Sequence, residues 1–253
     1  MQTKISCVII AKNEEHTIAR CLESVKWMDE IIVVDTGSTD RTREICSQFD
    51  VQLFEIAWNG FGKAKQFAVE QATNDWVFSI DCDEEMTPEL QKRIKDILSG
   101  PITVEGFTVK RRTFYLKRLI QHSGWNRDYP LRFFNKTCGT FNDNILHESV
   151  SLSGKKERIE EHLLHYSYPD IETHLEKMRP YTKMAAQQLA DKGKKASLTS
   201  AFTHGFSKFI KMYFLQLGIF DGAEGLILAV ISAFGVYLKY LRLWQLTIYM
   251  HRH

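Results

Sequence analysis

Apolar runs and helical patterns alternate through the first hundred residues. Largely apolar runs of strand length occur at residues 5–11, 31–34 and 76–80, and residues 51–56 are a further strand candidate. The first two are separated by Ile18, Leu22 and Val25, which recur at helical spacing. Such runs are typical of strands buried on both faces, and their alternation with helices predicts an α/β fold built on a mainly parallel sheet.

Helix-start signals accompany these segments. Asn13 precedes Glu14 and Glu15, and we predict that it caps the first helix. Thr87 is predicted as the N-cap of a later helix, because Pro88 follows at the first helical position. Two further helices are expected over residues 41–49 and 63–72.

The pattern changes after residue 100. Short strand-like segments occur at residues 106–116, 131–136, 147–152 and 162–168, and we expect them to extend the same sheet over its open edge. Beyond Pro169 the pattern is helical, starting with residues 171–192. We therefore predict one domain over residues 1–168, with halves at 1–100 and 101–168, and a helical C-terminal region over residues 169–253.

The C-terminal region carries a broad aromatic stripe between Phe202 and Leu217. The uncharged run 226–238 has thirteen residues before Lys239, and Arg242 follows. A membrane-spanning helix needs about twenty apolar residues. Two interpretations remain open: a buried helical hairpin packed on the α/β domain, or a helix pair lying on an anionic membrane surface.

Composition limits the class of protein. The 253 residues are 44% hydrophobic and 25% charged, which is typical of a globular protein. A net charge of +2 without a dense basic stripe does not favour a nucleic-acid partner. The five scattered cysteines include no Cys-x-x-Cys pair, and the N-terminus enters a strand without an apolar leader. Both features favour a reduced, cytoplasmic location.

Candidate chemistry lies where predicted strands end. Asp35 closes the second strand, and Asp81 and Asp83 follow the apolar run 76–80. The carboxyl ends of parallel strands form the ligand crevice of open α/β sheets. Two such carboxylates suit Mg²⁺, which completes its shell with water and phosphate oxygens. Alternatively, these acidic residues only lie in a loop and at the N-terminus of the following helix, where negative charge is favourable.

Two common nucleotide motifs are absent from the sequence. No Gly-x-Gly-x-x-Gly follows the first strand, and no Gly-x-x-x-x-Gly-Lys-Ser/Thr occurs. A crevice with one isolated aspartate and one aspartate pair suits a nucleotide whose base is held at one end and whose diphosphate is held by a cation at the other. These features indicate a sugar nucleotide.

Three segments carry a resemblance to a known family. Residues 8–15, 33–42 and 81–84 resemble the N-terminal signatures of the family 2 glycosyltransferases, which are inverting enzymes of the GT-A fold. The resemblance covers residues 3–170. Within the family, residues 58–62, 146–148 and 218–225 are similar to stretches of the bacterial lipopolysaccharide inner-core glucosyltransferases that act on heptose.

The resemblance implies a donor site for a UDP-sugar. The backbone near Ala11 and the side chains of Glu14 and Asp35 are expected to hold the uracil and ribose. Lys65 is expected at the base or a phosphate, and Asp81 at the ribose or a metal-bound water. Gln66 stands where the family usually has asparagine, and it has no assigned role.

The resemblance also implies a divalent cation, Mg²⁺ or Mn²⁺, as cofactor. Asp83 is the expected ligand, and His165 is the candidate for the histidine that such enzymes often add. His162 is an alternative to His165, and either histidine could instead be a core residue. The cation would neutralise charge on the UDP leaving group.

Inverting transfer needs a base for the acceptor hydroxyl. Glu148 is the candidate by its distance from the metal motif, although a solvated strand-end carboxylate is the alternative. The family's usual Glu-Asp pair is here His147-Glu148, so His147 has no assigned role. Trp125 and Arg132 are candidate acceptor-binding residues, which could stack on sugar and bind phosphate. The alternative is that the basic residues of this half are only surface charge or protect a strand edge.

The expected function is metal-dependent transfer of glucose from UDP-glucose to a lipopolysaccharide heptose. The enzyme would sit peripherally on the cytoplasmic face of the inner membrane. Alternatives are a family member with an exopolysaccharide, lipid-carrier or protein acceptor, a sugar-nucleotide-forming nucleotidyltransferase, and an inactive binding module. A nucleotidyltransferase needs a Gly-rich, Arg-containing loop, which residues 11–15 do not provide.

Overall fold

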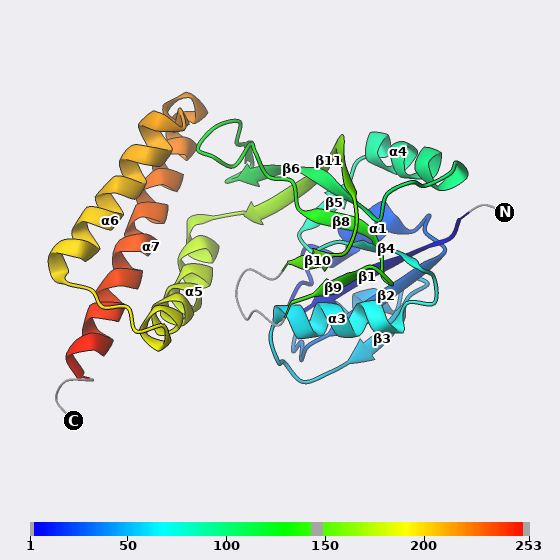
Figure 1. Ribbon diagram of the computed structural model, residues 1–253, viewed down its shortest axis with the longest axis horizontal. Helices are drawn as coiled ribbons and strands as arrows, with labels where there is room; N and C mark the ends of the chain where they lie inside the picture. Colours follow the sequence, from blue (N-terminus) through cyan, green and yellow to red (C-terminus); the bar gives the residue numbers. More distant parts are fainter. Residues whose placement is uncertain (1–2, 143–148, 250–253) are drawn as a thin grey trace. The chain divides into compact units, whose positions relative to one another are not determined.

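The chain folds into two compact units. A computed structural model describes residues 3–142 and 149–249 (Figure 1). Residues 1–111 and 128–165 form the first unit, called here the sheet unit. Residues 112–127 and 166–253 form the second, called the helical unit. The segment 112–127, which the sequence pattern assigned to the acceptor half, belongs to the helical unit.

The predicted parallel sheet is present in the sheet unit. Four strands run in the order β3-β2-β1-β4, each parallel to its neighbours. They are β1 (Ile5–Ala11), β2 (Glu30–Asp35), β3 (Gln52–Glu55) and β4 (Trp76–Ser79). Ala11 lies opposite Asp35, and Asp35 lies opposite Glu55, so these strands end together.

Helices cover both faces of this sheet. They are α1 (Ile18–Val25), α2 (Thr42–Cys46), α3 (Phe61–Gln71) and α4 (Pro88–Ser99). Successive side chains of a strand point to opposite faces, and β1 shows the consequence. Cys7 packs in a cluster with α1 and α4, whereas Val8 packs with α3. The expected α/β fold is therefore confirmed.

The two predicted helix starts have different outcomes. The Oγ1 of Thr87 accepts the N–H of Leu90 at 3.3 Å, and Pro88 occupies the first turn of α4 as predicted. The prediction that Asn13 caps the first helix is wrong, because α1 begins at Ile18. Asn13 has φ = 55°, and its Oδ1 accepts the N–H of Thr39 at 2.8 Å in the neighbouring loop.

Antiparallel strands extend the sheet beyond β4. β8 (Leu131–Asn135) pairs with β4, followed by β6 (Gly106–Tyr115), β11 (Lys156–Tyr168) and β5 (Glu84–Met86). The sequence did not predict β5. β7 (Arg118–Leu119) pairs with β6, and β9 (Gly139–Phe141) forms a separate hairpin with β10 (Val150–Leu152).

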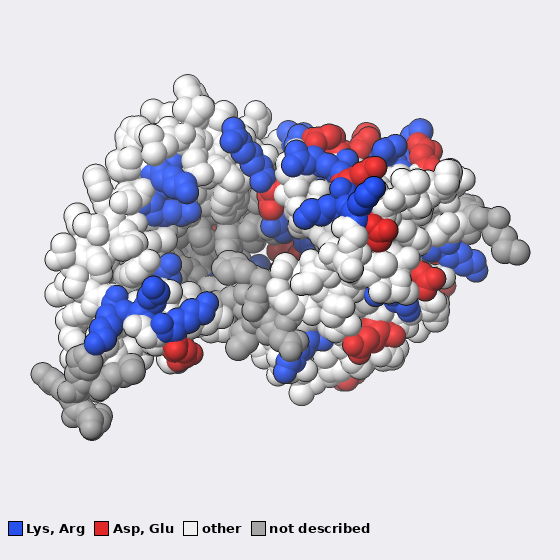
Figure 2. All heavy atoms as spheres, viewed as in Figure 1, with Lys and Arg blue, Asp and Glu red and all other residues white. Residues whose placement is uncertain are grey.

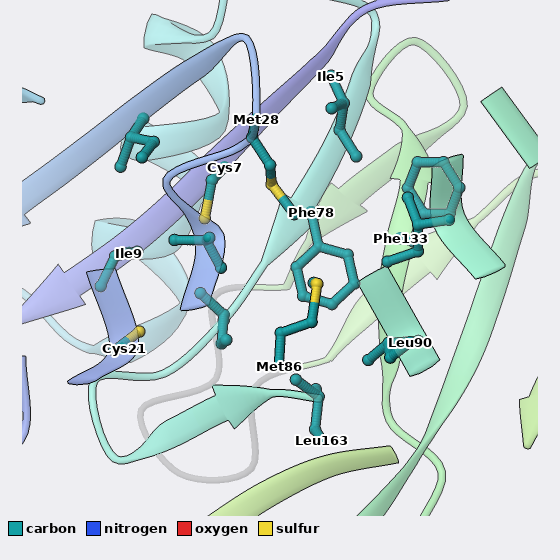
Figure 3. Close-up of a cluster of buried hydrophobic side chains, with 14 of the residues drawn as sticks. Ile5, Cys7, Ile9, Cys21, Met28, Phe78, Met86, Leu90, Phe133 and Leu163 are labelled. Atoms are coloured by element: carbon teal, nitrogen blue, oxygen red, sulfur yellow. The ribbon is translucent and has the colours of Figure 1, made fainter. Parts of the chain in front are cut away.

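The larger core of the sheet unit joins both halves of the sheet. Phe78 of β4 and Phe133 of β8 are fully buried, with Met86 of β5 and Leu163 of β11 in the same cluster (Figure 3). The Phe133 ring stacks on Phe107 of β6 at a centroid distance of 5.2 Å. This packing holds β5, and the loop before it, against the carboxyl end of the parallel strands.

The helical unit contains a helix hairpin and a third helix packed on it. Its elements are α5 (Ile171–Asp191), α6 (Leu198–Ile210), the π-helical turn η1 (Lys211–Leu215), the 3₁₀ turn η2 (Gly218–Asp221) and α7 (Gly222–Tyr249). Gly205 of α6 is so close to α7 that an added Cβ would lie 2.9 Å from the Cβ of Tyr237. The hydrophobic core of the helical unit is centred on Tyr115, Met212 and Leu228.

Helix α7 differs from the expected interrupted segment. By length and composition, residues 218–248 could cross a membrane: the most apolar 18-residue window has a mean hydropathy of 1.8, and 22% of that window is buried in the protein. Arg242, which was expected to interrupt the apolar run, has partners on α5: its guanidinium donates to the carbonyl of Arg179 at 2.6 Å and to the Oγ1 of Thr182 at 2.7 Å. Lys239 lies 4.7 Å from the ring centroid of Tyr240.

Candidate functional site

The loops after β1, β2 and β4 are tied together at the carboxyl edge of the sheet. The N–H of Thr36 donates to the carbonyl of Ala11 at 2.9 Å, and the N–H of Asn13 donates to the Oγ of Ser38 at 2.9 Å. From the third loop, the thiol of Cys82 donates to the carbonyl of Ile10 at 3.0 Å. These contacts bring the backbone of Ala11 near the loops that carry Asp35 and Asp81.

Asp35 has one buried oxygen without a donor. The side chain is 1% exposed, and its Oδ2 accepts the N–H groups of Gly37 at 3.1 Å and Ser38 at 3.0 Å. Its Oδ1 is buried and has no hydrogen-bond partner among residues 3–142 and 149–249. A buried acceptor without a donor costs free energy, so this oxygen is suited to a donor group supplied by a ligand.

Asp81 lies between two buried cations. The Nζ of Lys65 is 2.7 Å from its Oδ1, and Nη2 of Arg132 contacts its Oδ2. Lys65 is 4% exposed and Arg132 is 5% exposed. Burial alone would raise the pKa of Asp81, but the charges of Arg132 and Lys65 outweigh it and hold the pKa well below its usual value. Asp81 is therefore a fixed, ionised carboxylate.

Glu84 is the second carboxylate of this network. It is fully buried, and its Oε1 accepts from Nη2 of Arg132 at 2.5 Å and from Nη1 of Arg111 at 3.0 Å. Its Oε2 accepts the N–H of Asp81 at 3.1 Å. The Nη2 of Arg111 also forms an ion pair with Oδ2 of Asp128 at 2.5 Å. Glu84 thus fixes both the backbone of Asp81 and the guanidinium that neutralises it.

The sequence pattern predicted no role for Glu84. The alternation of this strand, in which Glu84 and Met86 are buried while Glu85 between them is partly exposed, is visible only in the structure, because the sequence Glu-Glu-Met does not alternate between polar and apolar residues. Three residues preceding Thr87-Pro88 are too few to show that alternation convincingly.

Asp83 and His165 lie beside each other. The Nε2 of His165 is 3.4 Å from Oδ2 of Asp83, and β5 and β11 pair so that His165 lies opposite Glu84. No group of three or more His, Cys, Asp or Glu residues suited to a metal occurs in the described part of the chain. One carboxylate and one imidazole nevertheless fit a cation such as Mg²⁺, which keeps several waters and binds substrate phosphates.

The remaining donor-site candidates also lie on this edge. Oε2 of Glu14 accepts from the Oγ1 of Thr17 at 2.5 Å, and the N–H of Glu14 donates to the Oγ1 of Thr42 at 2.7 Å. Gln66, which had no assigned role, accepts the N–H of Phe141 through its Oε1 at 3.0 Å. Gln66 therefore ties α3 to β9 and holds the helix that carries Lys65.

For three candidates, Glu148, Trp125 and Arg132, the cluster gives no support to the expected role. Glu148 and the adjacent His147 lie outside the described residues. Trp125 belongs to the helical unit, where its ring packs edge-on to Tyr115 at a centroid distance of 6.1 Å. Arg132 is in the cluster but is enclosed by Asp81 and Glu84, so its burial gives no support to the predicted contact with an acceptor.

A surface cavity of about 370 Å³ lies elsewhere, lined by residues that include Lys4, Glu30, Asp50 and Thr73. Its position is at the amino ends of β2 and β3. Because open α/β sheets bind ligands at the opposite, carboxyl edge, the cluster around Asp81 remains the candidate site.

Residues 6–152 match the sequence family described as Glycosyl transferase family 2. The chain belongs to this family. It is therefore a glycosyltransferase, and its sheet of parallel and antiparallel strands with flanking helices is the GT-A fold that the resemblance implied.

Related proteins match this chain in sequence over nearly its whole length. The uncharacterized glycosyltransferase RP128 of Rickettsia prowazekii is 34% identical over 97% of this chain and 88% of its own length. The lipopolysaccharide core biosynthesis glycosyltransferase LpsC of Rhizobium meliloti is 26% identical over 95% of this chain and 92% of its own.

Solved structures show more distant similarity. Residues 1–349 of TarS from S. aureus are 15% identical, with a TM-score of 0.49 over 96% of this chain and 90% of that one. Glucosyl-3-phosphoglycerate synthase of Mycobacterium tuberculosis, in complex with Mn²⁺, UDP-glucose and phosphoglyceric acid, is 25% identical, with a TM-score of 0.39 over 44% of each chain.

Proposed function

We propose that this glycosyltransferase moves a hexose, with glucose of UDP-glucose as the first candidate, to a lipopolysaccharide core heptose or a similar membrane-anchored glycan. The observation that carries the donor assignment is the buried Oδ1 of Asp35, which has no donor among the described residues. The N3–H of uracil is a donor that this oxygen can accept. Ala11 and Glu14, on the adjoining loop, complete the candidate base and ribose site.

The neighbouring cluster suits the diphosphate end of the donor. Asp83 and His165 would hold a divalent cation, Mg²⁺ or Mn²⁺. When bound there, the cation supplies positive charge against the negative charge that develops on departing UDP. Asp81 is fixed by Lys65 and Arg132, and the lone pairs that these contacts leave can accept from a ribose hydroxyl.

The base is a separate proposal. Glu148 takes the proton from the acceptor hydroxyl while that oxygen attacks C1 of the hexose from the face opposite UDP. The new bond from the acceptor oxygen to C1 forms as the bond from C1 to UDP breaks, and UDP departs with the electron pair. This displacement inverts the configuration at C1.

The acceptor assignment rests on sequence likeness. LpsC, whose name assigns it to lipopolysaccharide core biosynthesis, matches almost the whole of this chain at 26% identity. Trp125 remains our candidate for stacking on an acceptor sugar. An acceptor of this kind puts the enzyme at the cytoplasmic face of the inner membrane, as a peripheral protein. Acceptors of exopolysaccharide, lipid-carrier or protein type are the alternatives.

UDP-glucose hydrolysis by the purified protein, measured with Mg²⁺ or Mn²⁺, tests the donor and cation. We expect Asp83→Ala to lower this rate by at least about 100-fold, as expected when charge stabilisation of a leaving group is removed. Glu85→Ala is the matched control, because Glu85 is a partly exposed acid two residues further along the chain, and its carboxylate lies 3.8 Å from Arg20. A protein that binds UDP but neither hydrolyses nor transfers any UDP-hexose would instead be an inactive binding module.

A panel of UDP-hexoses with truncated lipopolysaccharides as acceptors tests the rest of the proposal. Product analysis should show one hexose added to a heptose, with inverted configuration. Transfer only to another class of glycan would replace the acceptor assignment while leaving the donor assignment intact.

A further inference from the structure

The two units carry opposite net charge. The sheet unit has 18 Lys and Arg against 25 Asp and Glu, a formal net charge of −7. The helical unit has 15 Lys and Arg against six Asp and Glu, a formal net charge of +9. The small total of +2 therefore hides a strong asymmetry. A charge of this sign and size attracts anionic surfaces.

Most of the helical unit's visible face in Figure 2 is uncharged, with groups of basic side chains and little acidic surface. Lys208, Lys211 and Lys239 form no ion pair with a carboxylate in the described parts of the chain. Burial lowers the pKa of Lys208, and the charges of Lys211 and Lys239 lower it further, so the three lysines lie near one another. An anionic partner would relieve this repulsion.

The turn between α6 and α7 exposes a concentration of apolar side chains, which we call the apolar corner. These side chains are 47% to 75% exposed. They belong to Phe214, Leu215, Leu217, Ile219 and Phe220. Solitary exposed apolar residues are ordinary, but five within seven positions mark a surface that contacts something apolar.

The apolar corner is held in a defined conformation. Asp221 is 2% exposed, and its carboxylate accepts from the N–H groups of Gln121 and His122 at 3.0 Å each, and from the Oγ of Ser123 at 3.1 Å. Gly218 packs so tightly that an added Cβ would lie 2.6 Å from the Oγ of Ser123. The exposed side chains are therefore presented on a fixed turn and have no route to the interior.

Basic residues surround this corner. Lys211 starts the turn η1, and the N–H of Gln216 donates to its carbonyl at 2.8 Å. Arg118 lies against Gly222, where an added Cβ would be 3.0 Å from its Nη1, and Lys117 precedes it in an exposed position. Two acidic residues of this region already have partners. Asp221 is buried, and the carboxylate of Glu224 lies 3.5 Å from the guanidinium of Arg118.

We propose that the apolar corner inserts into the headgroup region of an anionic phospholipid bilayer, with Lys117, Arg118 and Lys211 at the phosphates. Apolar side chains below a basic rim are the arrangement that membrane-surface proteins use. A second copy of the chain is a poorer occupant, because pairing two such corners would bring two rims of like charge together. The inference rests on the proposed function in one respect: a membrane-anchored acceptor explains why the enzyme would bind a membrane.

The helix hairpin offers a competing surface. Leu198, Phe202 and Phe206 are exposed at intervals of four along α6, as are Leu226, Val230 and Phe234 along α7. A membrane protein lying flat on this face would not depend on the corner. The experiment must therefore distinguish the corner from the helix faces.

Co-sedimentation of the full chain with phospholipid vesicles makes this distinction without donor or acceptor. We expect binding to phosphatidylcholine vesicles containing about one-third phosphatidylglycerol to be at least about tenfold tighter than to phosphatidylcholine alone. Leu215→Ser with Phe220→Ser should weaken binding to the anionic vesicles by about tenfold or more. Lys117→Ser and Lys211→Ser should each weaken it by about fivefold.

Phe202→Ser with Phe206→Ser is the matched control on the helix face, and it should retain most of the binding. Equal losses in the corner and helix-face variants would overturn the assignment of the corner, as would equal binding to neutral and anionic vesicles. Self-association of the free protein that is abolished by the corner substitutions would favour a second copy and also overturn the proposal.

The same variants separate this inference from the proposed function. All should unfold at temperatures close to that of the unsubstituted protein, because the substituted side chains are exposed. UDP-glucose hydrolysis in solution should be unchanged in the corner variants. Failure of hydrolysis in every variant would count against the proposed function and leave the vesicle result standing, whereas normal hydrolysis without vesicle binding would refute the docking alone.

Discussion

The Nζ of Lys65 lies 2.7 Å from Oδ1 of Asp81, in a site where the lysine is buried and the aspartate side chain is 27% exposed. The pair is part of a larger set in which Lys65, Arg132 and Arg111 face Asp81, Glu84 and Asp128. Three positive and three negative groups balance. Removing one member leaves a charge without its partner, and buried charges without partners are costly.

Replacing Lys65 by methionine should therefore damage both stability and donor use. We expect a loss of about 3 kcal/mol in the free energy of unfolding, reduced to the extent that Arg132 still neutralises Asp81. We also expect kcat/KM for UDP-glucose to fall by about 10–100-fold. Thermal unfolding and steady-state kinetics measure the two effects. Lys63→Met, an exposed position on the same helix, should change neither by much.

Glu84→Gln should be more disruptive than its near-identical shape suggests. Arg111 and Arg132 both lose a carboxylate partner, and about 3–5 kcal/mol of stability should be lost. Adding Arg132→Met should recover part of this loss, because the second change removes the excess positive charge that the first leaves in the network. If the two losses simply add in the chemical denaturation of the double variant, the residues do not act as one network.

Asp35→Asn should change which base the site prefers. The asparagine carbonyl can still accept from Gly37 and Ser38, which puts an NH₂ donor where the unpaired Oδ1 now lies. The N3 of uracil is a donor, whereas the N3 of cytosine is an acceptor. We expect UDP affinity to fall at least about tenfold, and affinity for CDP relative to UDP to rise. Isothermal titration calorimetry with both nucleotides checks this, and an unchanged ratio would remove Asp35 from the base site.

His174 should make the helical unit sensitive to acid. It lies 3.0 Å from the hydroxyl of Tyr115 and stacks on Tyr168 at a centroid distance of 4.1 Å. Burial lowers the pKa of His174 from 6.5 to about 4. The unfolded chain therefore binds a proton that the folded chain excludes, so the stabilisation is complete above pH 6.5 and is lost as the pH falls toward 4.

The measurement is thermal unfolding at about pH 7.5 and about pH 5, between which the stability lost from this group should be about 2 kcal/mol. His174→Phe keeps an aromatic ring and removes the proton site. Its unfolding temperature should depend less on pH than that of the unsubstituted protein. Equal pH dependence in both proteins would exclude His174 as the source.

The parallel half of the fold was predictable because its signals are local. The run from Trp76 to Ile80 is apolar enough to be a strand in any context, and Thr87-Pro88 starts a helix by its own backbone chemistry. Asn13 shows that a local helix-start signal can mislead. A short polar side chain near a helix start has two possible partners, and here a hydrogen bond to the neighbouring loop prevails over the cap.

The candidate site was predictable in outline but not in its charge arrangement. Asp35, Asp81 and Asp83 follow directly from strand ends, because their positions depend only on the parallel topology. The enclosure of Arg132 between Asp81 and Glu84 depends on β8 lying next to β4, which is a pairing of segments some fifty residues apart. No spacing in the sequence distinguishes such a guanidinium from one on the surface.

Strand β5 has a consequence for how the protein is made. It follows the parallel strands closely in the chain, yet its ladder partner is β11, whose residues are synthesised about eighty positions later. The juxtaposition of Asp83 with His165 therefore has to wait until the ribosome has released β11. A shortened gene product ending before residue 156 would retain the three N-terminal signature segments but would lack His165, and with it the pair that we propose for the cation. On this proposal, the signature segments alone do not constitute an independently working module.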